Sequence, residues 1–105
     1  MARVKVDPGA CGLPTRVEVV QKGKNIFHLE IRSECEMVQR LERELPALYM
    51  LDAFKRVLDN PVYKMASICV KHVSCPVPCA ILKALEAEAG LAVPKDIVIS
   101  FEKEK

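Results

Sequence analysis

The chain has 105 residues, half of them hydrophobic, and its 16 Lys and Arg residues nearly balance 14 Asp and Glu residues. A chain of this length is expected to form a single domain over residues 1–105, able to bury a core without a metal or a disulfide. The formal charge of +2 is spread along the chain, which argues against a nucleic-acid partner. No stretch reaches the roughly 18 apolar residues of a membrane span.

Five cysteines are an odd number, so they cannot all pair within one chain. The N-terminal residues also lack the apolar segment of a secretory signal. Together these features favour a reducing compartment, and the expected location is the cytoplasm, with no membrane partner. The sequence does not indicate the oligomeric state, and a protein partner is possible.

The first third of the chain predicts strands. Residues 3–6 alternate between charged and apolar side chains, and residues 7–14 form a turn-rich loop that carries Cys11. Residues 15–20 and 26–32 flank a short polar segment and read as a hairpin. The side chains expected on its buried face are Val17, Val19, Phe27, Leu29 and Ile31.

The middle of the chain predicts helices. Ser33 and Glu36 have the spacing of a capping box, which would place Cys35 in the first turn of a helix that ends near Pro46. Residues 47–58 repeat the helical spacing, and the pair Asn60 and Pro61 opens a third segment. For residues 67–71 the pattern leaves open whether the helix ends or a strand begins.

The last third predicts one helix and one strand. The helix begins with Cys75 as its cap or first residue and stops before Gly90. Residues 96–101 read as a final strand with Ile97, Ile99 and Phe101 pointing inward. The predicted fold is therefore α+β, a two-layer sandwich of three or four antiparallel strands with about three helices on one face.

Cys75 and Cys79 lie directly before and within the start of the last helix. Backbone N–H groups and the positive end of a helix dipole favour the thiolate, the form that binds metal or attacks disulfides. Because four residues advance a helix by about 400°, these two thiols would lie on one side. Their Cys-x3-Cys spacing differs from the Cys-x2-Cys of most metal knuckles.

Cys11, Cys35 and Cys75 each occur at a turn or helix start, and we expect their sulfur atoms to converge. Zinc and iron–sulfur clusters both use four ligands of this kind. The predicted metal ligands are Cys11, Cys35, Cys75 and Cys79, with Cys69 or His72 as substitutes for the fourth. Taken alone, Cys69 lies in an apolar run and is more simply a packed core residue.

The leading function from sequence is thus a small metal-binding thiol protein without an organic substrate of its own. One alternative is a thiol-redox protein that uses Cys75 and Cys79. Another is an interaction module whose cysteines are merely packed. The motifs of hydrolases and nucleotide-binding enzymes do not occur in the sequence, so whether it is an enzyme stays open, with the balance against it.

The residues 75–85, which read Cys-Pro-Val-Pro-Cys-Ala-Ile-Leu-Lys-Ala-Leu, and the ending at residues 90–96, Gly-Leu-Ala-Val-Pro-Lys-Asp, carry a resemblance over nearly the whole chain. They resemble a small uncharacterised cysteine-containing protein family of anaerobic prokaryotes, which implies a shared fold and no assigned activity. Residues 11–85 are also similar to the TSCPD domain at the ends of some ribonucleotide reductases. That similarity implies metal-binding roles for Cys11, Cys35 and Cys75, with Val77 in place of the Asp of that motif.

Overall fold

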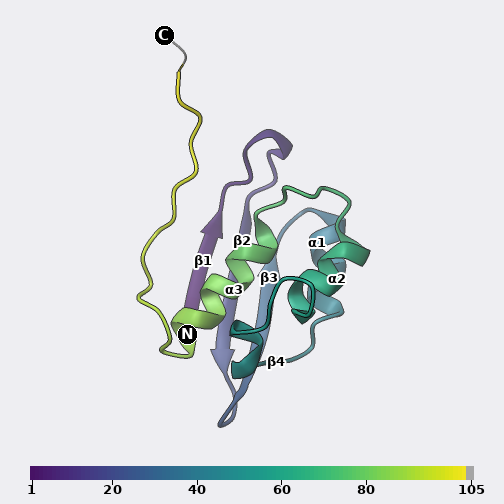
Figure 1. Ribbon diagram of the computed structural model, residues 1–105. Helices are drawn as coiled ribbons and strands as arrows, with labels where there is room; N and C mark the ends of the chain where they lie inside the picture. The colour runs from purple at the N-terminus through teal and green to yellow at the C-terminus, as the bar shows by residue number, and fades with distance from the viewer. Residues whose placement is uncertain (104–105) are drawn as a thin grey trace.

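The computed structural model describes residues 1–103 and has an α+β fold, in which a four-stranded antiparallel sheet is covered on one face by three helices (Figure 1). The strands are β1 (Ala2–Val6), β2 (Thr15–Gln21), β3 (Ile26–Arg32) and β4 (Leu48–Tyr49). The α-helices are α1 (Glu36–Arg43), α2 (Pro61–Cys69) and α3 (Val77–Glu88), and two short 3-10 helices are η1 (Gly9–Cys11) and η2 (Met50–Ala53). This architecture confirms the fold class predicted from the sequence.

The sheet has the simple order β1-β2-β3-β4, with every neighbouring pair antiparallel. The predicted hairpin forms. In it, Val17 lies opposite Ile31 and Val19 lies opposite Leu29 on the helix-covered face. Charged side chains alternate with them on the other face, which is wet. This one-sided burial is what the period-2 pattern of the sequence requires.

Helix α1 begins differently from the predicted capping box. Its N-cap is Cys35, whose side chain forms no capping hydrogen bond. The Ser33 hydroxyl instead accepts the Cys35 N–H at 3.1 Å, and its backbone carbonyl accepts the side-chain amide of Gln39 at 2.7 Å. Ser33 is thus used in the turn that leaves β3, so Cys35 precedes the helix rather than lying in its first turn.

Residues 47–58 do not form the predicted helix. Leu48 pairs with Phe27 as part of β4, and the chain then makes the 3-10 turn η2 and an irregular stretch up to Asn60. Buried Asp52 stabilises this irregular backbone, because its carboxylate accepts the Tyr49 N–H at 2.8 Å. The Asn60 side chain donates to the Asp52 carbonyl at 2.7 Å. Tertiary pairing and buried polar contacts override the local helical spacing here.

Helices α2 and α3 form where the sequence predicts helices. Helix α2 runs to Cys69, so residues 67–71 end a helix rather than begin a strand. Helix α3 begins at Val77, so the prediction that Cys75 is its cap or first residue is wrong. Asn60 caps α2 by accepting the Val62 N–H at 3.0 Å. Helix α3 has Pro76 as its N-cap and Ala89 as its C-cap, and Gly90 follows with a φ of 74°. Hydrogen bonds from the Gly90 and Leu91 N–H groups back into the last turn complete a Schellman motif. No helix among the described residues is long and apolar enough to cross a membrane.

The end of α3 is fastened to the sheet by Glu88. Its carboxylate lies 3.0 Å from the N-terminal ammonium group of Met1 and accepts the Gln21 N–H at 3.0 Å. These donors lower the pKa of Glu88, the Gln21 hydrogen bond most strongly. The contact fixes the C-terminal end of α3 beside the start of β1.

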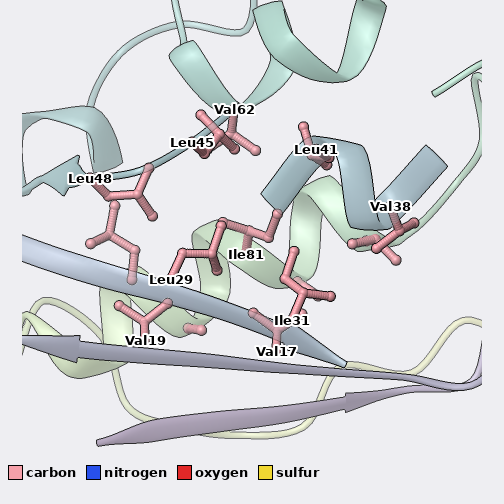
Figure 2. Close-up of a cluster of buried hydrophobic side chains, with 14 of the residues drawn as sticks. Val17, Val19, Leu29, Ile31, Val38, Leu41, Leu45, Leu48, Val62 and Ile81 are labelled. Atoms are coloured by element: carbon pink, nitrogen blue, oxygen red, sulfur yellow. The ribbon is translucent and has the colours of Figure 1, made fainter. Parts of the chain in front are cut away.

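The core lies between the sheet and the helices, as Figure 2 shows. Phe27, Leu41 and Leu85 are among its largest fully buried side chains. In the close-up, Val17 and Ile31 of the sheet face Ile81 of α3. Cys69, at the end of α2, is also part of this core, in line with its prediction as a packed residue.

Residues 96–101 do not form the predicted final strand. No strand or helix is found between Leu91 and residue 103, and the chain runs away from the body of the molecule (Figure 1). Ile99 is 91% exposed and Phe101 is fully exposed, so the inward orientation predicted for them is wrong. The alternation of a strand is present in the sequence, but within this chain the segment has no neighbouring strand.

Candidate functional site

Three separate segments meet at the end of the molecule opposite the N-terminus (Figure 1). They are the β1–β2 loop, the junction between β3 and α1, and the α2–α3 loop. Each contributes one cysteine, Cys11, Cys35 or Cys75, to a cavity of about 740 Å³. The apolar side chains around these thiols are those of Leu13, Met37, Val38, Val70, Val73 and Val77.

Cys11 is the most accessible of the three thiols. It is the last residue of η1 and is exposed. Gly12 follows with a φ of 67° and donates its N–H to the Gly9 carbonyl at 3.0 Å. The Asp7 carboxylate accepts the Gly9 N–H at 3.2 Å, so local hydrogen bonds give this exposed loop a defined turn.

Cys35 has the most firmly held backbone. Its N–H donates to the Ser33 hydroxyl, and its carbonyl accepts the first helical hydrogen bond of α1, from the Gln39 N–H at 3.0 Å. The Ser33 hydroxyl also accepts a hydrogen bond from the buried hydroxyl of Thr15, at 2.9 Å. Cys35 is thereby anchored to the start of β2 and to α1, and its side chain is half-buried.

Cys75 closes a turn in the α2–α3 loop, because its N–H donates to the His72 carbonyl at 3.1 Å. The same loop is tied to α1 by the Lys71 N–H, which lies 3.4 Å from the Met37 sulfur. Pro76 then caps α3, so Cys75 lies one residue before the cap. His72 lines the cavity together with Cys75.

The three thiols interact electrostatically. Burial raises the pKa of the Cys75 thiol, and the neighbouring thiols of Cys35 and Cys11 raise it further. A hydrogen bond from the Val77 N–H acts in the opposite direction but is outweighed by burial. The thiolate expected for Cys75 from its place near a helix start is therefore not favoured in the protein by itself.

The other cysteines, Cys69 and Cys79, and His28 are not among the residues that line this cavity. Cys79 lies near Tyr63 of α2, whose pKa is raised by burial and then by the Cys79 charge. Cys69 is buried in the core. His28 is on the exposed face of β3, opposite Val20.

The donor set suits a soft metal ion, but the site is not pre-formed. Three thiols and an imidazole are ligand types of zinc and of iron–sulfur clusters. In residues 1–103, however, no three His, Cys, Asp or Glu side chains are grouped so that they could hold one metal ion. A metal would have to draw the three thiols of the cavity closer together.

Sequence reasoning missed the residues that build the walls and supports of this cavity. The Thr15 and Ser33 hydroxyls join β2 to β3, and Met37 holds the α2–α3 loop. A possible signal was their position, since each lies within four residues of an element end or of a candidate cysteine. Spacing alone could not show that they contact one another.

The fold and the thiol-lined cavity describe a small α+β protein with a cluster of cysteines. Comparison with protein-family models identifies the family to which it belongs. Residues 2–101 match the model described as "Family of unknown function (DUF6951)". The chain belongs to this family, which agrees with the resemblance to an uncharacterised family seen in the sequence. Searches of the curated proteins and of the solved structures found no match.

Proposed function

We propose that this protein binds a soft metal centre, a zinc ion or an iron–sulfur cluster, through Cys11, Cys35 and Cys75. The observation that carries the proposal is the meeting of these thiols, from three different segments, at one largely apolar cavity. The resemblance of residues 11–85 to the TSCPD domain, which is inferred from the sequence alone, implies the same three residues. As a protein of free thiols, it would work in a reducing compartment such as the cytoplasm, consistent with the anaerobic origin that the resemblance suggests.

A bound cation would change the electrostatics of the cavity. The neighbouring thiols and burial all disfavour the ionised form of Cys75 in the free protein. A bound cation reverses this penalty, because it stabilises several thiolates at once and releases their protons. Ionising these thiols is therefore unfavourable in the metal-free protein. A bound metal ion would make their thiolate forms favourable.

The fourth donor in this proposal is His72. It lines the same cavity as Cys75 and lies three residues before it. Cys79 was the fourth candidate from the sequence, but it is not among the residues that line the cavity. Cys69 is buried in the core, where a metal would have to displace packed side chains.

The loops supply the adjustment that metal binding requires. Cys35 is fixed by hydrogen bonds to Ser33 and Gln39, whereas Cys11 and Cys75 belong to connecting loops. Closure would therefore bring the two loop cysteines toward Cys35. The buried side chains of Val38 and Val77 would shield the inner side of such a centre from water and strengthen the metal–thiolate interaction there.

The test is metal analysis and visible spectroscopy of anaerobically purified protein. We expect one centre per chain, with brown absorption for an iron–sulfur cluster or bound zinc without colour. The Cys35→Ser variant should lose the centre, while the matched control Cys79→Ser should retain it. Metal-free wild-type protein, or equal loss in both variants, would contradict the proposal. A metal-free protein that forms a Cys75 to Cys79 disulfide would favour the redox alternative.

A further inference from the structure

The C-terminal segment 96–101 has the pattern of a strand but no strand partner. Ile97, Ile99 and Phe101 occupy every second position, with Val98 and Ser100 between them, and all three are exposed, Phe101 fully. Among the described residues, no backbone hydrogen bond involves residues 96–103. The family model nevertheless extends to residue 101, so the segment belongs to the unit that the family shares. An exposed apolar row of this kind marks an interaction site.

The same chain also offers an unpaired sheet edge of matching length. Strand β1 is an edge strand that pairs only with β2 in the part of the chain that the structure describes. Its outer N–H and C=O groups are therefore available to another strand. On the helix-covered side, Ala2 and Val4 are only half-buried, which leaves an apolar margin beside α3 that an added strand could cover.

The link to the segment is poorly suited to place it on its own β1 edge in the antiparallel direction. Helix α3 ends beside the start of β1, where Glu88 contacts Met1, so a strand leaving it would run parallel to β1. Antiparallel pairing would require the link to travel about 17 Å along β1 and then reverse. The link has only residues 90–95, and it is shortened by the turn at Gly90 and by a hydrogen bond between the Lys95 N–H and the Val93 carbonyl.

A second copy removes this restriction, because a two-fold axis perpendicular to β1 reverses the direction of the incoming strand. Antiparallel pairing is slightly more stable per residue than parallel pairing, and it would continue a sheet in which every described pair is antiparallel. We propose that the protein forms a dimer in which residues 96–101 of each copy add to the β1 edge of the other. This proposal is independent of the proposed metal centre.

Both outer-face residues of β1, Arg3 and Lys5, are positively charged. Lys5 lies directly opposite Arg16 of β2, and like charges in this position repel each other. If Ile99 lies opposite Val4, its neighbours Ile97 and Phe101 also face the helices. In this register Val98 lies directly opposite Lys5. Asp96 lies diagonally across from Lys5, which attracts it, and directly opposite Asp7, the residue after β1, which repels it.

The experiment is sedimentation velocity of the full chain over a range of concentrations, together with two variants that add the same charge at adjacent positions. Ile99→Asp places a carboxylate on the buried side of the added strand and should convert the dimer to a monomer. Val98→Asp places it on the wet side, near Lys5, and should leave the dimer intact. Both residues are exposed in the single chain, so we expect neither change to unfold it.

Three results would overturn the proposal. The first is a monomeric full chain at every concentration, whether residues 96–101 exchange their amide protons freely or are protected by pairing within the chain. The second is a dimer that persists in Ile99→Asp, which would then use another surface. The third is equal loss of the dimer in both variants, because the alternation of buried and wet positions would then be absent.

Discussion

At the scale of single residues, the pKa of the Cys75 thiol depends on where helix α3 begins. A thiol in the first turn of a helix is normally stabilised as a thiolate, but α3 begins at Val77 and Cys75 precedes its cap. It receives one helpful hydrogen bond, from the Val77 N–H, against burial and two neighbouring thiols. The balance raises its pKa, so the free protein holds this thiol protonated.

The raised pKa predicts a loss of stability at alkaline pH. Because the folded state favours the protonated thiol, its contribution is fully present below the ordinary pKa of 9.0 and is lost as the pH rises through the higher pKa of the folded protein. The free energy of unfolding of metal-free protein, measured by denaturant titration, should therefore fall above about pH 9. Cys75→Ser should reduce this fall, and the adjacent control Ser74→Ala should not. An identical pH dependence in all three proteins would contradict the assignment.

At the scale of elements, Asn60 connects the irregular 50–59 segment to α2. It is buried, and its side chain both accepts the Val62 N–H and donates to the carbonyl groups of Asp52 and Lys55. Two elements therefore depend on one side chain.

Replacing Asn60 should destabilise the protein strongly. We expect Asn60→Ala to lower the free energy of unfolding by about 2–4 kcal/mol, because it removes a helix cap and leaves buried carbonyl groups unpaired. Asn60→Asp keeps the cap acceptor but loses the donated bonds, so it should fall between Ala and wild type. Ser67→Ala, an exposed control on the same helix, should change stability by less than about 0.5 kcal/mol. Equal effects of Asn60→Ala and Ser67→Ala in a denaturant titration would show that Asn60 has no such role.

Some elements could be predicted from local sequence signals alone. The hairpin of β2 and β3 was predictable because its alternation, its turn and its burial all agree. Helices α2 and α3 were predictable because Asn60 and Gly90 mark a start and an end by local chemistry alone. Local signals are reliable where a segment's own residues satisfy its backbone and bury one face.

Two elements were mispredicted because their partners are distant in sequence. Residues 47–58 have helical spacing, yet Leu48 is taken into β4 by Phe27 and Asp52 reorganises the rest. Residues 96–101 have strand alternation, but alternation does not say which strand, or which copy, lies alongside. In the candidate site, sequence could nominate the cysteines, but their shared cavity and the exclusion of Cys79 from it depend on the packing of three loops.

At the scale of the whole molecule, the thiol cavity lies apart from the centre of the core. The largest buried side chains, such as Phe27, Ile81 and Leu85, come from the sheet and α3, whereas Cys11 and Cys75 come from loops at one end. Burial of this core supplies the stability that a domain of 105 residues needs. We therefore expect the cysteines to serve binding, and the fold to persist without a metal, unlike that of a zinc finger.

The most direct test of this account is a zinc titration of the metal-free protein with simultaneous measurement of released protons. We predict saturation at one zinc per chain with release of about three protons near neutral pH, as three protonated thiols become ligands. The Cys11→Ser, Cys35→Ser and Cys75→Ser triple variant should keep its far-UV circular dichroism and a cooperative melt, yet bind no zinc. Wild-type protein that shows no saturable binding, or a folded triple variant that binds zinc with the same proton release, would contradict the assignment of these three cysteines as a metal site.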